Sequence, residues 1–185
     1  MLLYVLLALV VSLQVFFIIL IVGYLWFLVD SLFFGETFET PPEAVAVIAS
    51  VLAGRSIGTL IDLGSCYGEF AHALAARMPS LTIIGVDQGF IRVFIARFRT
   101  RRQRLVRFAT RDLFKTDISA ADALHVYLPR EMLPRLVQKM RDEARPGTLI
   151  CTFRETLPDW DPERVHAVPG LESHEQVYEY CVPGK

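Results

Sequence analysis

The stretch IDLGSCYGEF, residues 61–70, decides the fold. Its apolar residues up to Leu63 indicate the end of a buried strand, and the residues from Glu69 onward are typical of a helix. Gly64 and Gly68 lie between the two and predict a tight turn. In open α/β sheets, ligands bind where such turns leave the carboxyl ends of the strands. The stretch therefore predicts a ligand-binding turn after a first parallel strand.

Apolar runs and helical patterns alternate outward from this stretch. Because the runs are apolar throughout rather than at every second residue, they indicate parallel strands covered on both faces. The predicted fold class is α/β, a doubly wound, mostly parallel sheet closed by one antiparallel pair, RVHAV and QVYEYCV. Strands are expected within residues 58–63, 81–87, 104–112, 122–129 and 148–153, and helices within 40–54, 69–78, 90–98 and 131–143.

The first of these helices has recognisable start and stop signals. Thr40 is expected to cap it, with Glu43 three residues later completing a capping box, and Pro41 suits a first turn. Gly54 is expected to end it.

The N-terminal segment differs from everything that follows. Residues 1–29 contain no charged side chain and are long enough to cross a bilayer as a helix, with Tyr24 and Trp26 near one end as interfacial aromatics. A cleaved signal peptide would have a basic start and a shorter apolar core. A buried core helix would be shorter and have a polar face. We therefore expect a transmembrane anchor at 1–29, a linker at 30–39 and the α/β domain at 40–185.

Charge and cysteine content exclude several classes of protein. The formal net charge of −1 over 185 residues gives no nucleic-acid signature. Cys66, Cys151 and Cys181 are an odd number without CxxC spacing, so they indicate neither a disulfide framework nor a zinc site. A reducing compartment is the simpler interpretation.

The candidate site collects acids and glycines at two strand ends. Asp87 ends the second strand, where a carboxylate can accept hydrogen bonds from both hydroxyls of a ribose. The G-x-x-x-G spacing of Gly64 and Gly68 departs from the dinucleotide fingerprint G-x-G-x-x-G. A glycine turn alone is common in α/β proteins, so the prediction depends on the whole set. The turn contributes Asp62, Gly64, Ser65 and Gly68.

The pattern D-L-G-S-x-x-G resembles motif I of the class I S-adenosylmethionine-dependent methyltransferases. The resemblance implies S-adenosylmethionine as cofactor, with the turn around its methionyl part and Asp87 on its ribose. It also implies that Asp112, in RDLF after the third strand, contacts the adenine amine. Cys66 and Tyr67 depart from the usual small residues of this turn, which puts the strength of cofactor binding in doubt.

A narrower resemblance is carried by TPPEAV, YLPREMLPRLVQKM, RPGTLICTF and LPDW in this order. It is to the archaeal-type protein lysine methyltransferases and their mitochondrial relatives, which carry a membrane segment before the domain. The resemblance implies methylation of a lysine side chain of a protein, with membrane proteins as candidate substrates.

The acceptor side is expected at the end of the fourth strand. Methyl transfer to an amine depends on positioning and desolvation, with no obligatory side-chain base. Tyr127 is a candidate catalytic and substrate-binding residue, with packing as the equal alternative. Pro129 is a further candidate for substrate binding, and so is Trp160, as a wall of the acceptor channel, with a core position as its alternative. His125 is expected to be a satisfied core histidine.

The segment 97–111 is dense in arginine. It is either a solvated surface or a patch that faces anionic lipid. With the anchor, it predicts a membrane partner, with the catalytic domain on the cytosolic side where the implied cofactor is made. Two other functions stay open: a methyltransferase for a lipid or small membrane-soluble molecule, and a non-catalytic membrane scaffold with the same fold.

Overall fold

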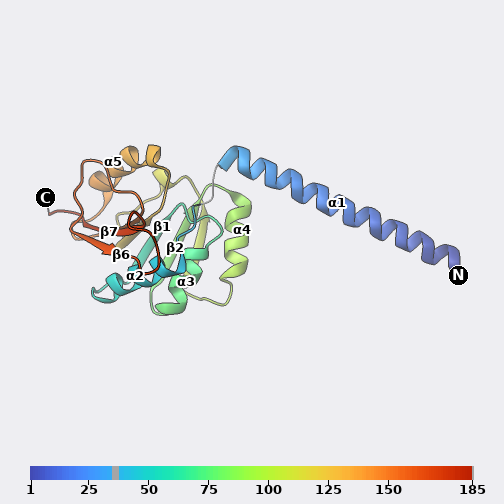
Figure 1. Ribbon diagram of the computed structural model, residues 1–185, viewed down its shortest axis with the longest axis horizontal. Coiled ribbons are helices and arrows are strands. Elements are labelled where there is room, and N and C mark those ends of the chain that lie inside the picture. Colours follow the sequence, from blue (N-terminus) through green and yellow to red (C-terminus); the bar gives the residue numbers. More distant parts are fainter. Residues whose placement is uncertain (35–37, 185) are drawn as a thin grey trace. The chain divides into compact units, whose positions relative to one another are not determined.

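The computed structural model describes residues 1–34 and 38–184 and falls into two units, residues 1–37 and 38–185 (Figure 1). The first unit is one helix, α1 (Leu2–Phe34). Its segment Leu2–Val29 is long and apolar enough to cross a membrane, and none of it is buried. The length and composition expected of a span are therefore present.

The second unit is built on a seven-stranded sheet in the order β3-β2-β1-β4-β5-β7-β6. Strands β1 to β5 all run parallel to one another, whereas β7 is antiparallel to both β5 and β6. This arrangement confirms the predicted mostly parallel α/β sheet and its closing antiparallel pair. The strands are β1 (Thr59–Leu63), β2 (Thr82–Asp87), β3 (Val106–Thr110), β4 (Ala123–Val126), β5 (Leu149–Phe153), β6 (Arg164–Ala167) and β7 (Gln176–Cys181).

Helices cover both faces of the sheet (Figure 1). One hydrophobic cluster joins the sheet to α2, α3 and α4, and a second joins its other face to α5. The central strands β4 and β5 are buried along their whole length, as two covered faces require. The helices of this unit are α2 (Pro42–Ala53), α3 (Glu69–Arg77), α4 (Phe90–Arg99) and α5 (Leu133–Glu143), with the short 3₁₀ turns η1 (Leu113–Lys115) and η2 (Arg130–Met132).

The start of α2 differs from the sequence prediction. Pro41 is the N-cap residue and no side chain caps the helix, so the predicted capping box of Thr40 and Glu43 is wrong. The hydroxyl of Thr40 lies 3.2 Å from Nε2 of His125 instead. A buried ring nitrogen of His125 without a hydrogen-bond partner would be costly. The Thr40 hydroxyl therefore bonds His125 rather than capping the helix, as the capping box would have required.

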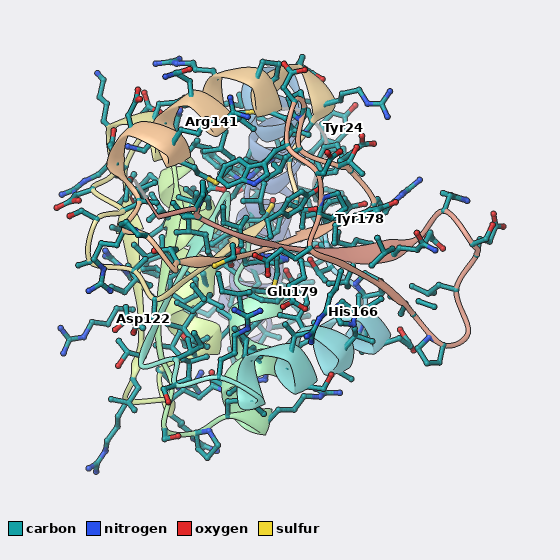
Figure 2. All side chains as sticks on the ribbon, turned by 90° about the vertical axis from the view of Figure 1, so that its left-hand side faces the viewer. Tyr24, Asp122, Arg141, His166, Tyr178 and Glu179 are labelled. Atoms are coloured by element: carbon teal, nitrogen blue, oxygen red, sulfur yellow. The ribbon has the colours of Figure 1, made fainter. Side chains whose placement is uncertain are left out.

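A buried carboxylate fastens the antiparallel edge of the sheet to α2. Glu179 of β7 is 1% exposed and bonds both Arg55, just after α2, and His166 of β6. Figure 2 shows Glu179 and His166 on the α2 side of the sheet, opposite Arg141 of α5. Burial would raise the pKa of Glu179, but its hydrogen bonds to His166 and Arg55 hold it below the ordinary value. The carboxylate therefore stays charged and orders this edge.

One aromatic ring fills the space left by two glycines beneath the turn. Gly85 of β2 is in register with Asp62 and Phe108 of its neighbouring strands. A Cβ on Gly85 would lie 2.3 Å from the Phe108 ring, and one on Gly68 would lie 2.8 Å from it. The close approach of Phe108 to the turn therefore requires glycine at both positions.

We predict that Gly85→Ala destabilises the second unit by about 1–3 kcal/mol, because the added methyl group overlaps the Phe108 ring and the side chain of Ser65. Denaturant unfolding of the full chain in detergent measures the change. Gly54→Ala is the matched control, since its Cβ would have no neighbour nearer than 3.6 Å. Equal stability of the two variants would contradict this account of the packing.

Candidate active site

The turn after β1 is held in a left-handed conformation at three positions. Gly64, Cys66 and Gly68 have φ values of 86°, 48° and 77°. The amides of Gly64 and Ser65 both donate to the carbonyl of Val86, at 2.9 Å each. These bonds fold the turn against β2 and bring α3 to begin directly after Gly68, with no side chain capping its first amides. Those amides therefore remain available to an anionic group.

A small hollow opens beside this turn. It brings together four predicted site residues, namely Asp62, Gly64, Ser65 and Tyr127. Cys66, for which we expected a packing role, also lines the hollow. The remaining lining residues are Phe38, Glu39, Thr40, Glu69, Phe70 and His125.

A buried chain of hydrogen bonds forms the floor of the hollow. Nδ1 of His125 lies 2.8 Å from Oδ1 of Asp62, and Nε2 lies 3.2 Å from the hydroxyl of Thr40. The ring also stacks on Phe70, with 3.6 Å between ring centroids. Because both nitrogens have partners, the expectation of a satisfied core histidine is confirmed. His125 fixes the direction in which the Asp62 carboxylate points.

Three buried polar atoms of the hollow have no protein partner among the described residues: Oδ2 of Asp62, Oγ of Ser65 and Oε2 of Glu69. Such atoms are costly unless a ligand or water satisfies them. The methionyl part of S-adenosylmethionine carries an ammonium, which suits the two carboxylates, and a carboxylate, which suits a hydroxyl donor. The donor set therefore fits this cofactor.

Asp87 supports the turn as well as ending β2. Its carboxylate accepts the amide of Gly89 at 2.7 Å and the amide of Cys66 at 3.0 Å. Burial raises the pKa of Asp87, although these two hydrogen bonds and Arg92 oppose the rise. Each oxygen keeps a further lone pair, so the group can still receive ribose hydroxyls. Asp87 does not line the hollow itself but adjoins it through Cys66.

Four other predicted site residues also lie outside the hollow. Gly68 ends the turn against Ala96 of α4, and Asp112 accepts the amide of Phe114 at the start of η1. Pro129 precedes η2. Trp160 packs on Tyr180 and borders a separate hollow with Arg141, near the C-terminal end of α5. The roles of these four residues in binding stay predictions.

Tyr127 is both packed and part of the hollow. Its ring meets Phe38 and Phe153 edge-on, at centroid distances of 5.2 and 5.0 Å, and it is 9% exposed. Its hydroxyl lies 3.4 Å from a guanidinium nitrogen of Arg154. The two alternatives raised by the sequence, packing and contact with a substrate, are therefore compatible.

Sequence reasoning missed five residues of the hollow: Phe38, Glu39, Thr40, Glu69 and Phe70. Phe38 and Glu39 fall within the expected linker at 30–39, and no local pattern distinguishes them there. Glu69 had a usable signal, because it directly follows the second glycine of the turn.

Cys66 is not poised as a nucleophile. Burial raises the pKa of its thiol to about 11, so the thiol is protonated at neutral pH. This agrees with the packing role expected from the sequence. The described residues also contain no group of His, Cys, Asp or Glu side chains that could hold a metal ion.

The sheet order, the glycine turn and the acids around it define the class of S-adenosylmethionine-dependent methyltransferases. Solved structures with this fold include an RNA methyltransferase from Salinibacter ruber in complex with S-adenosyl-L-homocysteine, at a TM-score of 0.70 and 24% identity over 80% of this chain and 95% of that one. The N-methyltransferase NodS from Bradyrhizobium japonicum superimposes with a TM-score of 0.61 at 14% identity, over 77% of this chain and 94% of that one.

Within this class, the family model of the ANTKMT methyltransferase domain matches residues 62–164, and the chain belongs to that family. It is 31% identical over 107 residues to a lysine N-methyltransferase of Caenorhabditis elegans that is named for ATP synthase, covering 56% of this chain and 55% of that protein. It is 30% identical over 141 residues to the adenine nucleotide translocase lysine N-methyltransferase of Mus musculus, covering 74% and 58%. The chain thus spans a little over half the length of these curated relatives.

We predict that Asp87→Ala abolishes measurable binding of S-adenosylmethionine while the second unit stays folded. The substitution removes the carboxylate expected to accept the ribose hydroxyls and also frees the amides of Cys66 and Gly89 that shape the turn. Isothermal calorimetry on the full chain in detergent measures binding, and circular dichroism checks the fold. Asp112→Ala probes the adenine end in the same way. Wild-type affinity in Asp87→Ala would show that the site is misplaced.

We also predict that His125→Leu weakens binding of S-adenosylmethionine about tenfold or more, because Asp62 loses the hydrogen bond that orients it. His125→Asn is the matched variant, since its amide can donate from nearly the same place as Nδ1 and should retain most of the affinity. Calorimetry distinguishes the two. Equal loss in both variants would mean that packing on Phe70, rather than the hydrogen bond, is what matters.

Proposed function

We propose that this chain is a membrane-anchored methyltransferase that uses S-adenosylmethionine to methylate a lysine side chain of a membrane protein. The observation that carries the proposal is the hollow beside Tyr127, where one oxygen of Asp62 and one of Glu69 have no protein partner and fit the cofactor in a chain of this family. Both curated relatives described above are named lysine N-methyltransferases, one for ATP synthase and one for adenine nucleotide translocase.

The residues of the hollow suit an amine acceptor. The cofactor, when bound, supplies a methyl group on a positively charged sulfur. The acceptor lysine must be neutral to react, and burial among aromatic side chains favours loss of its proton. Phe38, Phe70 and Tyr127 supply such surroundings, and the carboxylate of Glu39 offers an approaching ammonium a first partner. The chain thus contributes binding, orientation and exclusion of water.

Membrane attachment is the part of the proposal that α1 supports. A helix of this length without charge from Leu2 to Val29 is suited to a single crossing. We place the second unit on the cytosolic side, where the cofactor is made and where the three free cysteines would stay reduced. A substrate in the same membrane would then meet the enzyme by diffusion in two dimensions.

The test is methylation by the full chain in lipid nanodiscs, with a solubilised membrane-protein fraction and S-adenosylmethionine that carries an isotopically labelled methyl group. We expect the label on lysine side chains, identified by mass spectrometry of peptides. Label found in extracted lipid instead would favour the small-molecule alternative, and cofactor binding without any transfer would overturn the proposal.

We predict that Tyr127→Phe slows this transfer about tenfold while the Kd for S-adenosylmethionine stays unchanged. The variant keeps the ring that packs on Phe38 and Phe153 and removes only the hydroxyl near Arg154. Tyr178→Phe is the matched control, because Tyr178 packs against the hydrophobic cluster on the other face of the sheet. Unchanged transfer in Tyr127→Phe would restrict this tyrosine to packing.

A further inference from the structure

Helix α4 turns a row of phenylalanines outward. Phe90, Phe94 and Phe98 are spaced four residues apart, so they share one face, and they are 67%, 61% and 62% exposed. The inward face is made of Val93 and Ala96, which are buried. We call the three exposed rings the phenylalanine face. Helix α4 itself packs beside β2 and β3 (Figure 1).

This exposure is unusual for the rest of the second unit. Among the large apolar side chains described between residues 38 and 184, only Leu105 and Val165 are also exposed. Leu105 lies in the loop that follows α4, so four of the five belong to one region. Clustered apolar exposure of this kind marks an interaction surface rather than scattered surface residues.

The same region is strongly basic. Between Asp87 and Asp112 the sequence has eight arginines and no acidic residue. Arg97 bonds the carbonyl of Phe108, and Arg99 pairs with Glu69. Within the described part of the chain, no ion pair is formed by the exposed arginines of the loop after α4, of β3 and of the position directly after β3, and we call these the arginine run. They are Arg101, Arg102, Arg104, Arg107 and Arg111.

Rings and charges adjoin each other directly. The guanidinium of Arg101 lies 4.1 Å from the centroid of the Phe98 ring and donates to the carbonyl of Phe98. Apolar rings beside cationic side chains are the pattern of helices that lie in the interface of a bilayer. There the rings enter the acyl boundary and the cations meet lipid phosphates.

We propose that the phenylalanine face and the arginine run together bind the surface of a bilayer that contains anionic lipid. Charge complementarity selects this partner. A second copy of the chain, docked face to face, would bring two arginine runs against each other. The chain also carries α1, and only residues 35–37 separate it from the start of the second unit, so a lipid surface would be present at high effective concentration.

Binding of α4 to a bilayer would also stabilise the turn of the candidate site. Helix α4 begins directly after Gly89, whose amide bonds Asp87, and its Ala96 packs on Gly68 of the turn. A bilayer that holds α4 therefore holds two contacts of the cofactor-binding turn. The proposal does not require methyl transfer, and its test reads lipid contact alone, so it can fail or succeed independently of the proposed activity.

The test places a nitroxide label on the full chain in nanodiscs of phosphatidylcholine, with or without phosphatidylserine. Phe94→Cys carries the label, and Val165→Cys, which lies outside the basic region and is 50% exposed, is the control. Both are made with Cys181→Ala, since Cys66 and Cys151 are buried. With phosphatidylserine, we expect the label at 94 to be relaxed by oxygen and shielded from a water-soluble nickel complex, while the label at 165 stays accessible to nickel.

Two further measurements separate the contribution of charge from nonspecific apolar binding. At about 1 M salt the Debye length is only about 3 Å, so the attraction between the arginines and lipid phosphates is screened. The label at position 94 should then return to water. Arg101→Gln with Arg104→Gln should lower the ratio of lipid-bound to water-exposed label at position 94 about fivefold for each arginine replaced. Arg77→Gln with Arg164→Gln, two exposed arginines elsewhere, should leave it unchanged.

Three results would overturn the proposal. Equal access of nickel to positions 94 and 165 in every nanodisc would show that the face does not touch lipid. Shielding that is the same with and without phosphatidylserine would remove the role of anionic lipid. Shielding that depends on protein concentration rather than lipid would assign the face to a second copy or another protein.

Discussion

The hydrogen bond between Asp62 and His125 is the constraint on which the site depends. A carboxylate that is 2% exposed is costly in a protein interior unless a donor stabilises it. His125 supplies that donor from the neighbouring strand, and Thr40 satisfies the other side of the same ring. Residues 40, 62 and 125 come from three distant segments, so the pocket floor forms only when the sheet has formed. One oxygen of Asp62 is then left facing the hollow.

The segment that enters the second unit shares in this arrangement. Because Thr40 is fixed by His125, the preceding Glu39 and Phe38 are held at the wall of the hollow, and Phe38 packs on Tyr127. The first residues of the second unit, Phe38 to Thr40, therefore also form part of the wall of the hollow. A change at Phe38 or Thr40 would alter the pocket, although Phe38 lies in no recognisable motif and the motif that contains Thr40 gives no sign of this contact.

The positions of the strands along the chain and the mostly parallel character of the sheet could be predicted from the sequence, because apolar runs and glycine turns are local signals, whereas the order of the strands in the sheet was not predicted. The turn residues Asp62, Gly64 and Ser65 were also predictable, since one motif contains them. The capping box failed because Thr40 has a partner 85 residues away, which no local pattern reveals. Helix α4 shows the same limit: its phenylalanines have core-like spacing, yet the structure buries Val93 and Ala96 and leaves the rings outside.

The packing of Phe108 has a consequence for how this chain can change over evolution. Its ring occupies the space that side chains at positions 85 and 68 would need. The residues at positions 68, 85 and 108 thus compete for the same space, although they lie on the turn and on two different strands. A larger residue at 85 becomes acceptable only together with a smaller one at 108. Substitutions here should appear as compensated pairs among homologous chains, so the constraint set by the turn extends to Phe108, which does not line the hollow.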